Sequence, residues 1–221
     1  MVSLESALER AVSRGLKVNT VIDVGASDGR WTLTASKLFP EAKFFLVEPN
    51  QAHEASLQAI HSMYSNMDYV IAAAGDISGE IYFSTPDLFS GFIQEKSDEG
   101  NSKVIIEKLD FWIIKRNLPP PYVLKVNTNG AEWLVIRGAA ETLKQTNMVI
   151  LESYNFSEHG QLRFHEICLI MEELHFRCID IAEPLHRMKD RALSQFKLFF
   201  IPDSSFEFIS NHYYSNADLG E

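Results

Sequence analysis

One stretch near the start of the chain, Val21 to Gly29, limits the possible folds more than any other part of the sequence. It runs from β-branched apolar residues through an acidic residue into a turn of small residues, and residues 30–38 then have helical character. Glycine at Gly25 and Gly29 permits positive φ angles and a close approach of the backbone to another group. The stretch therefore predicts a strand, a glycine turn and a helix N-terminus, an arrangement that brings the backbone close to a nucleotide-like ligand.

Strand and helix patterns alternate along the rest of the chain, which predicts an α/β protein. The apolar run at 43–47 is typical of a strand buried on both faces of a parallel sheet. We expect a Rossmann-like, doubly wound, seven-stranded, mostly parallel sheet with an antiparallel last strand. The seven expected strands are 20–24, 43–47, 69–73, 122–126, 148–151, 176–181 and 196–201, with further short strands at 80–84 and 104–109. The expected helices are 28–39, 51–64, 110–117, 131–144 and 162–175.

The sequence has no linker or repeat that would divide it, so we expect one domain over 1–202 that begins with a helix at 3–15. Residues 203–221 are expected to form a tail. Residues 85–102 are polar and contain glycine, but apolar side chains such as Phe89 lie among them. Long loops in compact domains are usually lids or disordered segments, and the embedded apolar residues favour a lid.

Composition narrows the possible partners. The formal net charge is −10, and Lys and Arg are scattered, which argues against nucleic acid as the main partner. No apolar window is long enough for a membrane span, and the N-terminus lacks a secretory pattern. The two cysteines do not suggest a disulfide framework, so we expect a cytoplasmic protein. The histidines show no metal-ligand spacing, so no metal site is expected.

The residues around the glycine turn favour one cofactor. A dinucleotide would want Gly-x-Gly-x-x-Gly, whereas the turn offers only Gly25-x-x-x-Gly29. Asp23, just before the turn, suits a positively charged ligand such as S-adenosylmethionine (SAM), and Glu48 at the end of the second strand can accept hydrogen bonds from ribose hydroxyls. A dinucleotide oxidoreductase and a purely structural turn remain the alternatives. The candidate cofactor-binding residues are Asp23, Gly25, Ala26, Asp28, Gly29, Glu48, Pro49, Asp68, Ala73 and Asn127.

At this point the sequence resembles the FkbM family of SAM-dependent methyltransferases, over residues 20–202. The resemblance implies a methyltransferase fold and transfer of a methyl group to oxygen, or less often nitrogen, of a small-molecule, sugar or natural-product acceptor, with peptides as a further class. The blocks that carry it are Val21–Gly29, Val47-Glu48-Pro49-Asn50, Ala73-Ala74-Gly75-Asp76, and Lys125–Glu132 with Arg137-Gly138-Ala139.

The chain departs from the family pattern in the block after the fourth strand, which in the family reads roughly Lys-Ile-Asp-x-Glu-Gly-x-Glu. Asn127 and Asn129 stand at the two acidic positions. Asparagine keeps the hydrogen-bonding capacity but loses the charge and basicity of a carboxylate. The enzyme then needs no base, takes its base from elsewhere, or binds the cofactor as a catalytically weak scaffold. The candidate catalytic residues are Asn127, Glu132, Glu152 and His159.

Overall fold

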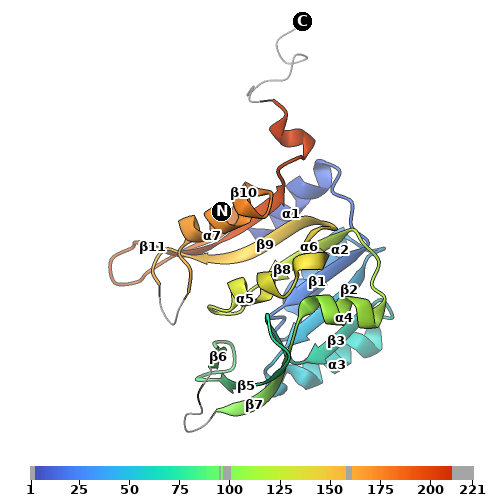
Figure 1. Cartoon of the computed structure of the whole chain (residues 1–221), viewed down its shortest axis with the longest axis vertical. Helices are drawn as coiled ribbons and strands as arrows, with labels where there is room; N and C mark the ends of the chain where they lie inside the picture. Colours follow the sequence, from blue (N-terminus) through green and yellow to red (C-terminus); the bar gives the residue numbers. More distant parts are fainter. Residues whose placement is uncertain (1–2, 95, 97–100, 158–160, 211–221) are drawn as a thin grey trace, which may run out of the picture.

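A seven-stranded sheet forms the centre of the protein, as the computed structural model in Figure 1 shows. The structure describes residues 3–94, 96, 101–157 and 161–210. The strand order is β10 (Phe176–His186), β11 (Leu193–Pro202), β9 (Thr146–Tyr154), β8 (Tyr122–Val126), β1 (Thr20–Val24), β2 (Lys43–Glu48) and β3 (Met67–Ile71). β1 is parallel to β2 and β8, whereas β11 is antiparallel to β9 and β10. This confirms the Rossmann-like, doubly wound, mostly parallel sheet with an antiparallel last strand.

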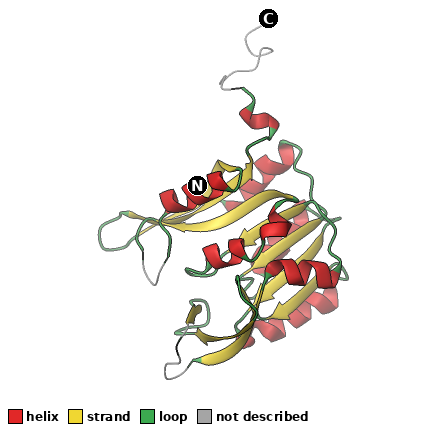
Figure 2. Ribbon diagram, in the orientation of Figure 1, coloured by secondary structure: helices red, strands yellow, loops and turns green. Residues whose placement is uncertain are grey.

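Helices cover both faces of this sheet (Figure 2). Strand residues alternate between two apolar clusters, so Val21 packs on one face and Ile22 on the other. The Val21 face carries α1 (Leu4–Ser13), α2 (Arg30–Leu38) and α3 (Glu54–Met63). The Ile22 face carries α4 (Leu109–Arg116), α5 (Glu132–Arg137), α6 (Ala140–Leu143) and α7 (Phe164–Glu173). Short 3-10 helices follow β2 and β11, namely η1 (Gln51–His53) and η2 (Phe206–Phe208).

A second, four-stranded sheet lies at the bottom of the view in Figure 1. Its order is β4 (Ala73–Ala74), β7 (Ser102–Glu107), β5 (Gly79–Ser84) and β6 (Phe92–Gln94). The sequence indicated β5 and β7 as strands but not their pairing. It also predicted a loop over 85–102, whereas Phe92–Gln94 pair with β5. β6 has only three residues, too short a run for a period to be recognised.

Several predicted elements differ in their limits, and two of these differences lie next to the small sheet. The third strand of the main sheet ends at Ile71, and Ala73 then leaves to pair with β7. The helix expected at 131–144 is divided into α5 and α6 around Gly138. A Cβ at Gly138 would lie 1.8 Å from the carbonyl oxygen of Gly75, so the chain passes close to the small sheet there. Among the described residues, no helix is both long and apolar enough to span a bilayer.

Candidate functional site

A cavity of about 250 Å³, here called the first cavity, lies at the carboxyl ends of the central strands. In open α/β sheets this edge is where ligands bind. The walls come from the ends of β1, β2, β8 and β9, from β4, and from the segment 83–93 of the small sheet. The lining residues used below are Gly25, Glu48, Asn50, His53, Ala73, Asn127, Thr128, Glu152 and Gln195.

The first turn, which follows β1, depends on glycine because of a contact with the turn after β8. Gly25 has a φ of +72°, and a Cβ added to it would lie 1.8 Å from the carbonyl oxygen of Asn127. Gly29, with a φ of +82°, begins α2, and its Cβ would lie 2.3 Å from Ile60 Cδ1. The two glycines therefore serve internal packing, and Gly25 also leaves its backbone at the cavity wall.

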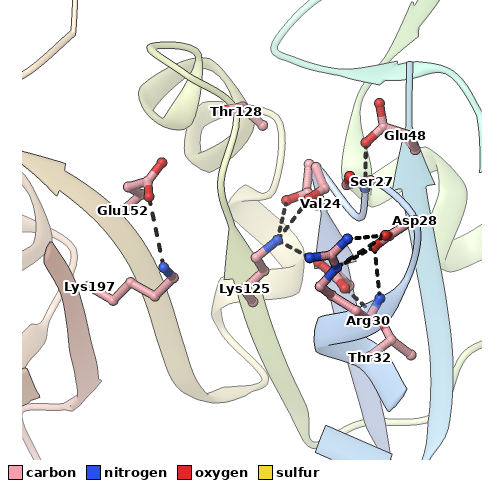
Figure 3. Close-up of polar contacts among 12 residues, drawn as sticks. Val24, Ser27, Asp28, Arg30, Thr32, Glu48, Lys125, Thr128, Glu152 and Lys197 are labelled. Carbon is pink, nitrogen blue, oxygen red and sulfur yellow. Dashed lines mark hydrogen bonds and ion pairs between the residues drawn. The ribbon is translucent and has the colours of Figure 1, made fainter. Parts of the chain in front are cut away.

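A buried ion pair between β1 and β8 fixes the relative position of the two turns. Asp23 Oδ1 accepts a hydrogen bond of 2.8 Å from Lys125 Nζ, and its Oδ2 accepts one of 2.6 Å from Thr32 Oγ1. Lys125 Nζ also donates to the Gly25 carbonyl oxygen at 2.8 Å. Figure 3 shows Lys125 reaching the first turn from the neighbouring strand. Both carboxylate oxygens of Asp23 therefore have partners within the protein, and its side chain is buried.

Glu48 lines the wall opposite the second turn. Its oxygens accept the N–H groups of Ser27, at 2.7 Å, and Asn50, at 2.8 Å, which hold the carboxylate at the cavity edge. Burial raises the pKa of Glu48, and the two N–H groups oppose that shift. Each oxygen keeps a second lone pair, so the carboxylate can still accept hydrogen bonds from a ligand.

The second turn, residues 127–130, is supported from behind by Glu132. Its carboxylate accepts the N–H groups of Thr128, at 2.9 Å, and Gly130, at 3.0 Å. Burial raises the pKa of Glu132, and these hydrogen bonds oppose the rise. In contrast, Thr128 Oγ1 is buried at the cavity and finds no hydrogen-bond partner among the described residues. The turn therefore presents neutral groups to the cavity, one of them unpaired.

Glu152 brings a carboxylate to the cavity from the end of β9. Its Oε2 accepts a hydrogen bond of 2.9 Å from the Tyr154 hydroxyl, and its Oε1 accepts one of 3.3 Å from Gln195 Nε2. Lys197 Nζ lies 3.8 Å from the same Oε1, on the left of Figure 3. Burial, with the charges of Glu132 and Glu152, raises the pKa of Tyr154, so its hydroxyl remains a donor.

Side chains from three elements hold the segment 85–91 over the cavity. Asn50 Nδ2 donates to the Leu88 carbonyl oxygen at 3.2 Å, and His53 Nε2 lies 2.9 Å from the same oxygen. Asn129 Nδ2 donates to the Gly91 carbonyl oxygen at 3.0 Å. The Phe89 ring lies against His53 and under the Arg30 guanidinium.

A second cavity, of about 540 Å³, adjoins the first and shares Gly25, Ser27, Phe89 and Asn127 with it. It extends between the start of α1, the start of α2 and the β10–β11 pair. The predicted residues Ala26 and Asp28 line this second cavity. Arg30 binds the Asp28 carboxylate and lowers its pKa.

Of the predicted residues, the structure brings Gly25, Glu48, Pro49, Ala73, Asn127 and Glu152 together at the first cavity. Asp68 lies in the first half of β3, away from the carboxyl edge, and pairs with Arg116 at 2.9 Å. His159 falls outside the described residues. Sequence reasoning missed Asn50, His53, Thr128 and Gln195. Asn50 and Thr128 lie within the family blocks, but no local pattern marks His53 and Gln195, because their places at the cavity arise from chain segments far apart in the sequence.

A sequence model described as the methyltransferase FkbM domain matches residues 23–178, most of the chain. The chain belongs to the FkbM methyltransferase family. Family membership confirms the resemblance, and SAM is the cofactor it implies. A search of curated protein sequences found no match. Within the described residues, no group of three or more His, Cys, Asp or Glu side chains is arranged to hold a metal ion.

Solved structures show the same fold. Methyltransferase FkbM from Methylobacillus flagellatus KT aligns with a TM-score of 0.52 and 13% identity, covering 81% of this chain and 43% of that one. An uncharacterized protein from Listeria monocytogenes serotype 4b aligns with a TM-score of 0.52 and 13% identity, covering 92% of this chain and 70% of that one. A Streptococcus mutans protein in complex with S-adenosylhomocysteine (SAH) aligns with a TM-score of 0.50 and 11% identity, covering 91% of this chain and 99% of that one. At such low identity the similarity establishes the fold alone.

The buried pair under the turns leads to a stability prediction. Replacing Lys125 by Met should lower the free energy of unfolding by roughly 3 to 5 kcal/mol, because it leaves Asp23 buried without its cation. Urea unfolding monitored by circular dichroism measures the change. Lys103→Met, which breaks the exposed pair with Glu80, is the matched control and should leave stability nearly unchanged. Equal effects of the two variants would contradict the role given to the buried pair.

Proposed function

We propose that this family member binds SAM in the first cavity and transfers its methyl group to a hydroxyl oxygen of a small-molecule acceptor. Sugars and natural products are the favoured acceptor classes, with a nitrogen nucleophile or a peptide as the alternative. The observation that carries the proposal is the arrangement of the first cavity. Glu48 and Ala73 form one wall, Glu152 forms the opposite end, and the neutral second turn lies between them.

The residues present fit the cofactor. Glu48 keeps free lone pairs that would accept the ribose hydroxyls, and Pro49 borders it. Ala73 and Ala74 lack bulky side chains, so a flat adenine ring could lie against β4. The backbone of Gly25 and the unpaired Thr128 hydroxyl are further polar groups that line the cavity. In this assignment Asp23, Gly29 and Glu132 support the walls of the first cavity without contacting the cofactor. Asp28 lines the second cavity.

Methyl transfer to a hydroxyl oxygen needs a nucleophile, a base that accepts its proton and a site from which water is excluded. SAM, when bound, supplies an electrophilic methyl carbon on a positive sulfonium. Glu152, held by Tyr154 and Gln195, would accept the proton of the acceptor hydroxyl as the new bond forms. Asn127 and Thr128 would orient the acceptor, and alignment of the reacting atoms accounts for much of the rate. The segment 85–91 would act as the lid that excludes water.

Replacing Glu152 by Gln tests the proposed base and the reaction together. Incubation with methyl-labelled SAM and a panel of sugars and polyhydroxylated natural products should yield a labelled methyl ether. The variant should lower kcat by about 10²- to 10⁴-fold, the usual range for a lost general base, while SAM still binds. An unchanged kcat would exclude Glu152 as the base. Binding of SAM without transfer to any acceptor would instead favour the cofactor-binding scaffold.

The ribose contact predicts a loss of affinity when Glu48 is replaced by Gln. We expect the dissociation constant for S-adenosylhomocysteine (SAH), the demethylated product, to rise about tenfold or more, because hydrogen bonds to a charged acceptor are lost. Calorimetric titration measures it. Glu41→Gln, at an exposed position before β2, is the control and should bind SAH like the wild-type chain. Unaltered affinity in the Glu48 variant would contradict the ribose assignment.

The lid contact gives a kinetic prediction. Asn129→Asp removes the N–H donor to the Gly91 carbonyl and places a negative charge beside it, so the lid should open more often. The dissociation rate of SAH should rise roughly tenfold, as expected for the loss of about one hydrogen bond, and the amides of 85–91 should exchange faster. Asn127→Asp adds the same charge to the cavity but keeps the lid contact, so amide exchange should not change. Equal exchange rates in both variants would show that Asn129 does not hold the lid.

A further inference from the structure

An extra residue in β10 lies beside the second cavity, where β10 pairs with β11. The pairing passes from Ala182 opposite Lys197 to Leu185 opposite Gln195, so two residues of β10 face one residue of β11. Glu183 at this bulge has a φ of +51°, a left-handed conformation that is uncommon for glutamate. Bulges redirect side chains and are frequent next to active sites.

The bulge determines the face of the sheet on which the Glu183 carboxylate lies. Side chains alternate between faces along a regular strand. Ala182 packs in the apolar cluster beneath α1 and α2, and Lys197, its partner, lies on that face. In a regular strand Glu183 would point to the opposite face. Instead, Glu183 Oε2 accepts a hydrogen bond of 2.7 Å from Lys197 Nζ, so the extra residue brings a carboxylate to Lys197.

Lys197 therefore lies between two carboxylates at unequal distances. Its Nζ is 2.7 Å from Glu183 Oε2 but 3.8 Å from Glu152 Oε1. Only the shorter distance is a hydrogen bond. Glu152 takes its own hydrogen bonds from Tyr154 and Gln195, which are neutral. These donors fix its orientation without cancelling its charge.

The other charged groups around the second cavity are mostly paired. Arg30 binds Asp28, and Lys125 binds Asp23. The Glu183 side chain is 44% exposed and that of Glu152 is 6% exposed, so the two carboxylates differ in access to solvent. An ion pair is stronger where water is excluded. If Glu183 were removed, the lysine would turn toward Glu152.

We propose that Glu183 is a positioning residue that holds Lys197 away from Glu152 and so keeps the Glu152 carboxylate free at the first cavity. The inference rests on the proposed function, because Glu152 matters only if the cavity holds the reacting groups. Lys197 then serves as a shared cation whose position sets how much negative charge Glu152 presents. The strained backbone at residue 183 is accounted for by this role.

The test compares SAM with SAH, because only SAM carries the positive sulfonium. The ratio of the SAH to the SAM dissociation constant, measured by calorimetry, therefore reports the charge of the cavity. Glu183→Gln should lower this preference for SAM about three- to tenfold, because Lys197 then neutralises Glu152. Lys197→Met should raise it. In the Lys197→Met background, Glu183→Gln should leave the ratio unchanged, whereas independent effects would lower it there by the same factor as in the wild-type chain.

The control is Glu80→Gln, which removes an exposed carboxylate that also pairs with a lysine and should leave the ratio unchanged. A role in packing alone would weaken SAM and SAH equally, so an unchanged ratio in Glu183→Gln overturns the inference. Lys197→Gln replaces Lys197→Met if the Met variant does not fold. If the wild-type chain binds neither compound, the proposed function itself fails. If it binds both and the variants keep the wild-type ratio, only the positioning role fails.

Discussion

The contact between the first and second turns is the constraint on which the site depends. Gly25 packs directly against the Asn127 carbonyl, at a distance that no side chain would allow. Beneath it, Lys125 connects β8 to Asp23 of β1 and to the Gly25 carbonyl. A buried, fully hydrogen-bonded pair is unfavourable to break and has a defined geometry, so it fixes the relative position of the two turns. The positions of Glu48 and of residues 127–129 in the cavity wall depend on this arrangement of the two turns.

The second turn carries asparagines in place of carboxylates, and the negative charge at this end of the site lies on another strand. Asn129 adopts a φ of +53°, a conformation that asparagine tolerates better than most residues. Its amide donates to a lid carbonyl, which an ionised carboxylate could not do. The negative charge at this end of the cavity comes instead from Glu152, one strand further along the sheet. We therefore interpret the two asparagines as neutral residues, of which Asn129 holds the lid, while Glu152 carries the negative charge. In the proposed arrangement, Glu183 and Lys197 determine how far that charge is neutralised.

The elements that could be predicted from the sequence are those with a local signal. The central strands are short apolar runs and most helices show an apolar period, and Glu48 could be recognised because it ends a strand. The small sheet could not be predicted, because β4 has two residues and the paired residues of β5 and β7 lie far apart in the sequence, from 19 positions (Phe83 and Ser102) to 27 positions (Gly79 and Ile106). The break at Gly138 likewise arises from its contact with Gly75. The Lys125 partner of Asp23 and the bulge at Glu183 are tertiary features without a sequence pattern. The hydrogen bonds of Glu132 to the second turn are local, but no sequence pattern indicates them.

In the proposed site, the first cavity holds the cofactor between Glu48 and the second turn. A crystal structure of the chain with SAH measures this directly. We expect ribose hydroxyls within hydrogen-bonding distance of the Glu48 carboxylate, adenine against Ala73, and the sulfur facing Asn127 and Thr128. Adenosine bound in the second cavity, or a ribose far from Glu48, would contradict it.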